Sequence, residues 1–197
     1  MKKRIAFFDF DGTITTCDTL LEFIKFQKGT FRYWLGFILH SPYIILYKLK
    51  IISNNTAKEK IFYYFWKGIP ESDFQTDCDH FASEKLPQFL RPKAIQEIQQ
   101  LKNKGFEVVI VSASPENWIR EWAKNFDAPV ISTRLEIHEN RLTGRIAGKN
   151  CHGTEKVARI RAVYDTGSFD DIYAYGDTSG DKPMLSLANF QFMKPFR

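Results

Sequence analysis

Two aspartates near the start of the chain, Asp9 and Asp11, have the residue type and spacing of a phosphate site that uses a metal ion. They stand at the end of the apolar run Ile5–Phe10, which predicts a buried strand entering a loop. Side chains two residues apart on a strand point to the same side, so the two carboxylates repel unless a cation or proton is shared. Mg²⁺ suits such a pair because it binds a few carboxylates, waters and substrate phosphate oxygens. Gly12 allows a tight turn whose amides can meet an anion, although an ordinary Asp-Gly hairpin turn is the alternative.

Three later segments place polar residues after predicted strands or at the start of a helix. Ser112 and Ala113 follow one apolar strand, the loop Gly176–Asp181 follows another, and Lys156 lies near the start of a helix. Each has an ordinary explanation, as a helix cap, a capping turn and a solvated charge respectively. Because ligands of open α/β sheets bind outside the carboxyl ends of the strands, we expect these segments to converge on Asp9.

The order of these four segments resembles that of the haloacid dehalogenase (HAD) superfamily of phosphohydrolases. A helical insertion between the first two motifs resembles the cap of subfamily IB, the branch that includes phosphoserine phosphatase. The resemblance covers residues 1–15 and 88–197 as a hydrolase core, with residues 16–87 as the inserted cap. The motifs that carry it are Asp9-Phe10-Asp11-Gly12-Thr13, Ser112, Lys156 and Gly176-Asp177-Thr178-Ser179-Gly180-Asp181.

The resemblance implies a Mg²⁺-dependent phosphomonoester hydrolase that forms an aspartyl-phosphate on Asp9, with Asp11 as general acid and base. It implies that Thr13 orients Asp11. The implied Mg²⁺ ligands are Asp9, Asp11 (through its backbone carbonyl), Asp177 and Asp181, and the implied phosphate-binding residues are Gly12, Ser112, Ala113 and Lys156.

Asp18 stands where phosphoserine phosphatases carry a Glu that meets the substrate ammonium. Its shorter carboxylate could meet an amine, but the favoured interpretation is that Asp18 caps the following helix. Phosphoserine is therefore not indicated as the substrate, and a small phosphorylated metabolite is expected. Some members of this branch act on lipid phosphates such as phosphatidylglycerophosphate, so a lipid-phosphate phosphatase is one alternative. A phosphomutase and a non-catalytic phosphate-binding module are two others.

The elements that position these residues alternate between strands and helices. This alternation predicts an α/β fold with a Rossmann-like, three-layer parallel-sheet core and a helical C1-type cap inserted after the first strand. Val130–Ile137 and Arg141–Ile146 flank Glu139-Asn140 and predict a hairpin. The other predicted strands are Phe106–Val111 and Ile172–Tyr175, and the predicted helices are Thr19–Gln27 with a stop at Gly29, Arg91–Lys104, Pro115–Asn125, Thr154–Tyr164 and Asp181–Ala188.

The insertion contains a run, Tyr33–Tyr47, without any Asp, Glu, Lys or Arg, and Arg32, Lys48 and Lys50 flank it. Its 15 residues fall short of the ~20 that span a bilayer. Two helices of a buried hairpin, broken at Ser41-Pro42, are the favoured interpretation. The alternative is an apolar surface with basic edges that makes peripheral contact with a membrane or an amphiphilic phosphate.

Composition sets wider bounds. A hydrophobic fraction of 44% with 26% charged residues is typical of a soluble globular protein. The net charge of +5 favours anionic partners but is spread along the chain, so no nucleic-acid partner is predicted. Three cysteines without a CxxC pair, and an N-terminal apolar stretch too short for a signal peptide, predict a cytoplasmic protein, with peripheral membrane attachment through the cap as the alternative. The sequence leaves the oligomeric state open.

Overall fold

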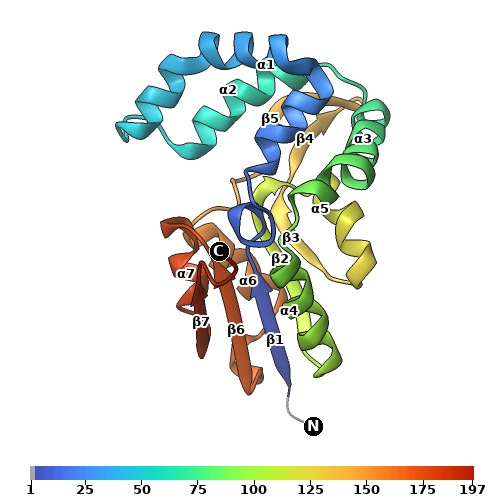
Figure 1. Cartoon of the computed structure of the whole chain (residues 1–197). Helices are drawn as coiled ribbons and strands as arrows, with labels where there is room; N and C mark the ends of the chain where they lie inside the picture. Colours follow the sequence, from blue (N-terminus) through green and yellow to red (C-terminus); the bar gives the residue numbers. More distant parts are fainter. Residues whose placement is uncertain (1–2) are drawn as a thin grey trace.

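A parallel sheet of five strands forms the centre of the molecule, in the order β3-β2-β1-β6-β7 (Figure 1). The computed structural model describes residues 3–197, so Met1 and Lys2, which open the basic N-terminal segment, lie outside the described residues. All four neighbouring pairs in the sheet are parallel. The strands are β1 (Arg4–Phe8), β2 (Glu107–Pro115), β3 (Val130–Thr133), β6 (Asp171–Gly176) and β7 (Phe190–Met193).

The central strand β1 is buried on both faces, as its continuous apolar sequence predicts. Ala6 and Phe8 belong to one hydrophobic core, and Ile5 and Phe7 belong to a second core on the opposite face. Helices α4 (Pro92–Asn103) and α5 (Glu116–Ala123) contribute to the first core, and α6 (Thr154–Val163) and α7 (Lys182–Leu185) contribute to the second. This arrangement confirms the predicted three-layer α/β core.

A second lobe stands over the carboxyl ends of the strands (Figure 1). Three helices between β1 and β2 build most of it, and the antiparallel hairpin β4–β5 packs against the second of them. The inserted segment is helical, as expected, whereas the exact division of the chain into core and cap stays a prediction. The elements of this lobe are α1 (Thr19–Lys48), α2 (Asn54–Trp66), α3 (Glu71–His80), β4 (Leu135–His138) and β5 (Arg141–Ile146), and α3 runs on into short helical turns at Phe81–Lys85 and Leu86–Phe89.

The prediction of a single strand over Val130–Ile137 is wrong. The segment divides at Arg134 into β3, which joins the main sheet beside β2, and β4, which pairs with β5. Tertiary pairing decides this division, since residues on both sides of Arg134 have strand propensity. The short edge strand β7 was not predicted, and the last predicted helix is confined to α7, preceded by a turn at Ser179–Asp181.

The predicted break at Ser41-Pro42 is also wrong, because α1 continues through Pro42. Proline cannot donate to the carbonyl four residues earlier, which is that of Ile38. The Ser41 hydroxyl donates to this carbonyl instead, at 2.8 Å, and so replaces the missing partner. The real interruption of α1 is at Gly29 (φ 76°, ψ 161°), where the sequence predicts a stop. Helix α1 therefore turns at Gly29 and then runs antiparallel to α2.

An aromatic cluster joins the two lobes. Phe23 of α1 stacks on Trp118 of α5 with ring centroids 4.6 Å apart, and both side chains are fully buried. The indole N–H of Trp118 donates to the Thr19 hydroxyl at 3.1 Å, which fixes the first turn of α1 against the core. Among residues 3–197, no helix combines the length and the hydropathy needed to cross a membrane.

Candidate active site

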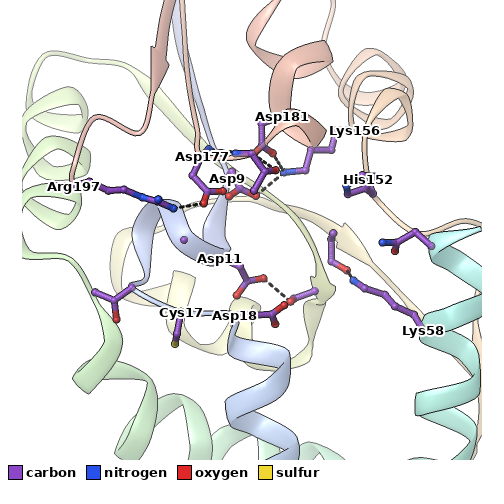
Figure 2. Close-up of a pocket in the computed structure, with 16 residues that line it drawn as sticks. Asp9, Asp11, Cys17, Asp18, Lys58, His152, Lys156, Asp177, Asp181 and Arg197 are labelled. Atoms are coloured by element: carbon purple, nitrogen blue, oxygen red, sulfur yellow. Dashed lines mark hydrogen bonds and ion pairs between the residues drawn. The ribbon is translucent and has the colours of Figure 1, made fainter. Parts of the chain in front are cut away.

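A cavity of about 390 Å³ lies between the two lobes, at the carboxyl ends of β1 and β6 (Figure 2). The chain builds the sheet outward from β1 through β2 to β3 and then resumes on the other side of β1 with β6. The cavity therefore lies at the reversal of strand order, which is the usual ligand position in open α/β sheets. Asp9, Asp11, Lys156, Asp177 and Asp181 all line it.

Asp9 follows the last residue of β1 and is only 6% exposed. Its Oδ1 accepts a hydrogen bond from Lys156 Nζ at 2.6 Å, and its Oδ2 accepts one from the Thr13 hydroxyl at 2.9 Å. Burial raises the pKa of Asp9 to about 7, although the Lys156 ammonium opposes this rise. The expectation that Thr13 orients Asp11 is wrong, since Thr13 holds Asp9.

Lys156 is a buried cation with three oxygen partners. Besides Asp9, its Nζ donates to Asp181 Oδ1 at 2.7 Å and to the carbonyl oxygen of Val111 at 2.9 Å, and the residue is only 2% exposed. Burial alone would lower the pKa of Lys156, but the carboxylates of Asp9 and Asp181 raise it above its ordinary value. Lys156 is therefore a buried, ion-paired ammonium, whereas its local sequence suggests a solvated lysine.

The loop after β6 supplies two carboxylates with different surroundings. The Oδ2 of Asp181 accepts from the backbone N–H groups of Asp177 (3.2 Å) and Thr178 (3.0 Å), while its Oδ1 faces Lys156. Burial acts to raise the pKa of Asp181, but Lys156 and these donors hold it below its usual value. Asp177 Oδ2 accepts from Arg197 at 2.7 Å, whereas its buried Oδ1 has no hydrogen-bond partner among the described residues. Burial and the neighbouring Asp181 raise the pKa of Asp177.

These carboxylates fit a hard divalent cation. One oxygen from each of Asp9, Asp177 and Asp181 lies within 4.8 Å of the others. The unpartnered Oδ1 of Asp177 needs a positive partner, because an uncompensated buried carboxylate oxygen is costly. Asp181 Oδ2 accepts from two backbone N–H groups and the Thr178 hydroxyl, and Oδ1 accepts from Lys156, so Asp181 fits a role in orienting the loop and Lys156 at least as well as direct ligation. The Asp11 carboxylate is not part of this group.

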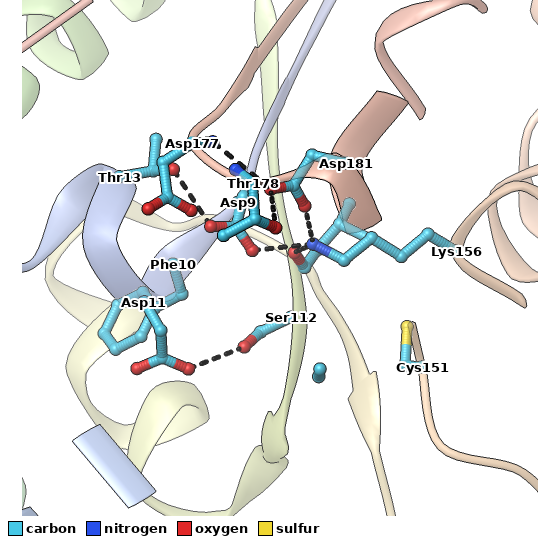
Figure 3. Close-up of polar contacts among 12 residues, drawn as sticks. Asp9, Phe10, Asp11, Thr13, Ser112, Cys151, Lys156, Asp177, Thr178 and Asp181 are labelled. Atoms are coloured by element: carbon cyan, nitrogen blue, oxygen red, sulfur yellow. Dashed lines mark hydrogen bonds and ion pairs between the residues drawn. The ribbon is translucent and has the colours of Figure 1, made fainter. Parts of the chain in front are cut away.

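Asp11 turns away from the other three acids (Figure 3). Its Oδ1 accepts from the Thr19 N–H at 2.8 Å and the Thr19 hydroxyl at 2.6 Å, and its Oδ2 accepts from the Ser114 hydroxyl at 2.5 Å. Ser112 adds a longer contact to the same oxygen at 3.4 Å and also accepts from the Ser114 N–H at 3.0 Å. Asp11 therefore links the first turn of α1 to the end of β2.

Gly12 is required by its surroundings. Its φ is +79°, and a Cβ at this position would lie 2.3 Å from Asp177 Oδ2. The turn after β1 can therefore approach the loop after β6 only because position 12 has no side chain. Ala113, the other predicted backbone contributor, also lines the cavity, while the Ser112 side chain is fully buried behind it.

Asp18 caps α1, as predicted, because its Oδ1 accepts from the backbone N–H groups of Leu20 (3.0 Å) and Leu21 (3.4 Å). The same carboxylate lines the cavity. The Asp18 side chain stays exposed at the cavity, and partial desolvation by the surrounding protein together with the nearby Asp11 raises its pKa above the ordinary value.

Several cavity residues were not predicted from the sequence. Lys58 reaches in from α2 and donates to the Ala113 carbonyl at 2.8 Å, and Arg197 approaches from the opposite side (Figure 2). Burial lowers the pKa of Lys58, although Asp18 opposes this shift. His152 also lines the cavity, and burial lowers its pKa. No local pattern marks these residues, because tertiary packing brings them together: Lys58 comes from the inserted lobe, and His152 and Arg197 come from separate segments of the core.

Known proteins resemble this chain over nearly its whole length. The family model for haloacid dehalogenase-like hydrolases matches residues 6–186. Protein CicA of Caulobacter vibrioides is 35% identical over 197 residues, which cover 96% of this chain and 85% of that protein. The phosphoserine phosphatase of Methanocaldococcus jannaschii is 23% identical, over 96% of this chain and 84% of that protein.

Solved structures share the fold. A protein of unknown function from Bordetella pertussis Tohama I superposes with a TM-score of 0.79 at 19% identity, over 95% of this chain and 88% of that chain. A phosphoserine phosphatase with a phospho-aspartyl intermediate analogue superposes with a TM-score of 0.63 at 19% identity, over 97% and 86%. Both comparisons include the inserted lobe, because they extend over nearly the whole chain.

Proposed function

This chain belongs to the haloacid dehalogenase-like hydrolase family and is a phosphatase, and we propose that it hydrolyses a phosphate monoester with Mg²⁺ through an aspartyl-phosphate on Asp9. The observation that carries the proposal is the buried group of Asp9, Asp177 and Asp181, within which Asp177 Oδ1 has no hydrogen-bond partner among the described residues. Asp9 and Asp177 would hold the cation, with Asp181 in support. When bound, Mg²⁺ supplies positive charge that neutralises these carboxylates and the phosphate oxygens.

Asp9 would act as the nucleophile. A carboxylate oxygen of Asp9 attacks phosphorus, and the bond between phosphorus and the ester oxygen breaks to form an acyl phosphate. Water then attacks phosphorus, which releases inorganic phosphate and restores the carboxylate. Lys156 and Thr13 each hold one oxygen of Asp9, so the carboxylate is fixed in orientation before substrate arrives.

Asp11 would act as general acid and then as general base: it donates a proton to the leaving oxygen in the first step and accepts one from the attacking water in the second. The hydrogen bonds from Thr19 and Ser114 hold its carboxylate on the cavity wall. Thr19 is the first residue of α1, so the orientation of Asp11 depends on how the inserted lobe sits on the core.

Lys156 would stabilise charge on the transferring phosphoryl group. Because the ammonium is already desolvated and hydrogen-bonded, its attraction for phosphoryl oxygens requires little reorganisation. Loss of one such group costs roughly 2.7–4 kcal/mol of transition-state stabilisation in comparable sites. The cavity amides near Gly12 and Ala113 would assist.

A small phosphorylated metabolite fits the cavity of about 390 Å³. The relative from Methanocaldococcus jannaschii makes phosphoserine one candidate. A lipid phosphate is a second candidate, and one specific observation favours it. Asn54 and Lys58, which line the cavity, lie in the first turns of α2, directly after the exposed apolar part of α1. An acyl chain could therefore leave the cavity along an apolar surface.

The test is phosphate release by the wild-type protein and by Asp9→Asn, with Mg²⁺ and with EDTA. The substrates should include phosphoserine, sugar phosphates, nucleotides, phosphocholine and a lysophospholipid-type phosphate. Asp73→Asn is a matched control, because Asp73 is an exposed aspartate of α3 outside the cavity. Turnover that requires both Mg²⁺ and Asp9 supports the proposal. Turnover that survives Asp9→Asn, or that is unaffected by EDTA, contradicts it.

A further inference from the structure

The part of α1 beyond Gly29, together with the turn that follows it, exposes an apolar surface that the proposed catalysis does not use. We call residues 30–51 the apolar arm. Its exposed apolar side chains recur every three or four residues, with Pro42 between Ile38 and Ile45, so they form one stripe along the helix. Phe31 is 80% exposed, Trp34 58% and Ile38 66%. Leu35, Ile45 and Leu49 continue the stripe to the end of the arm.

The stripe cannot turn inward, because the other face of the helix packs against α2. Gly36 is buried there, and a Cβ at Gly36 would lie 2.2 Å from the ring of Phe65. His40 packs on Tyr64 with ring centroids 4.9 Å apart. Figure 1 shows α1 as the outer helix of this pair. A surface helix normally exposes its polar face, and a contiguous exposed apolar patch marks an interaction site.

Charge identifies the kind of partner. No acidic residue occurs between Glu22 and Glu59, whereas exposed basic residues stand at both ends of the stripe. They are Arg32 at one end and Lys48 and Lys50 at the other. A symmetric dimer through this face would bring these basic ends together, so charge opposes a second copy of the chain. An apolar face with basic edges complements an anionic lipid surface, where side chains enter the headgroup region and lysines meet phosphates.

We propose that the apolar arm binds the surface of an anionic lipid bilayer. The stripe enters the interface while α2 remains on the protein side, and no part of the chain needs to cross the membrane. Because α2 begins directly after the arm and contributes Asn54 and Lys58 to the cavity, binding would hold the cavity beside the lipid surface. The proposal is independent of the proposed reaction, since binding to vesicles can be measured without turnover.

The first test is co-sedimentation of the whole chain with vesicles of phosphatidylcholine containing about one-third phosphatidylglycerol, against pure phosphatidylcholine. We expect Trp34→Glu/Ile38→Glu to lower partitioning onto the anionic vesicles at least tenfold. Val163→Glu places one glutamate at an apolar position on α6 that is as exposed as Ile38, and it should change partitioning less than twofold. Lys48→Ala/Lys50→Ala should weaken binding to anionic vesicles about fivefold for each lysine removed.

A second test needs no variant. Of the four tryptophans, Trp66, Trp118 and Trp122 are buried and only Trp34 is exposed. Brominated lipids at the membrane surface can therefore quench the fluorescence of Trp34 in the arm and of no other tryptophan. Quenching by anionic brominated vesicles is expected. The proposal is overturned if the wild-type protein neither sediments nor is quenched, or if the double glutamate variant binds as well as the wild type. A wild-type dimer that the double variant converts to a monomer, without vesicle binding, would instead assign the stripe to a second copy.

Discussion

Replacement of Lys156 by methionine tests how the centre of the site is held together. The Lys156 ammonium contacts Asp9 Oδ1, Asp181 Oδ1 and the Val111 carbonyl at 2.6–2.9 Å, and all three groups are buried. Methionine has similar length but leaves two buried carboxylates without their cation. Removal of one partner from a buried ion pair costs about 3–5 kcal/mol of unfolding free energy.

The loss of unfolding free energy in Lys156→Met should depend on pH. Without Lys156, the pKa of Asp9 rises further above its present value of about 7, so Asp9 takes up a proton near neutrality. Protonation relieves part of the repulsion. We therefore expect the full loss of about 3–5 kcal/mol near pH 8 and a smaller loss near pH 6. The double variant Lys156→Met/Asp9→Asn should recover part of the loss, because it removes both members of one pair.

The assay is urea unfolding followed by circular dichroism, in EDTA, at both pH values. A chain of this length loses roughly 2–4 °C of Tm per kcal/mol, so a thermal scan should show a drop of about 6 °C or more. Lys182→Met removes an exposed lysine and should stay within about 0.5 kcal/mol of the wild type. A Lys156→Met variant that loses less than about 1 kcal/mol at pH 8 would refute the account of Lys156 as the buried counter-ion.

Three further predictions concern Asp9, Gly12 and Gly36. Because burial raises the pKa of Asp9 to about 7, the metal-free protein should lose stability as the pH rises from about 4 to 7, and Asp9 should account for at most about 4 kcal/mol of this loss. Urea midpoints across this pH range measure the loss, and Asp9→Asn should reduce the slope of stability against pH. Gly12→Ala would force a Cβ against Asp177, so calorimetry should show Mg²⁺ binding weakened at least about tenfold; unchanged binding would contradict the contact. Gly36→Leu should cost about 1–3 kcal/mol in urea unfolding because the added side chain overlaps Phe65, and an equally stable variant would show that α1 and α2 are not in close contact.

Much of the core could be predicted because its signals are local. The apolar sequence of β1 specifies a strand buried on both faces, and Gly29 and Asp18 mark the break and the start of α1 through their own backbone preferences. The convergence of Asp9 and Asp177 follows from the general geometry of parallel sheets, in which strand ends meet at one edge. Such features depend on neighbouring residues or on rules that hold for every sheet of this class.

The features that escaped prediction depend on contacts between distant segments. Pro42 continues a helix that packs against α2, because the Ser41 hydroxyl replaces the missing donor. Lys58 reaches the cavity only when the inserted lobe packs on the core, and Arg197 reaches it only because the C-terminal segment returns to Asp177. Thr13 contacts Asp9 instead of Asp11 because the turn over Phe10–Ile14 faces its hydroxyl back toward β1. None of these contacts leaves a pattern in the sequence.

The central claim is a covalent phosphoryl group on Asp9, and acid-quenched turnover tests it most directly. The wild-type protein would be mixed with para-nitrophenyl phosphate and Mg²⁺, quenched within one turnover, digested and analysed by mass spectrometry. The account predicts a phosphoryl group on the peptide that contains Asp9, removable by hydroxylamine and absent from Asp9→Asn. Turnover with the phosphoryl group on another residue, or with none on the protein at any quench time, would contradict it.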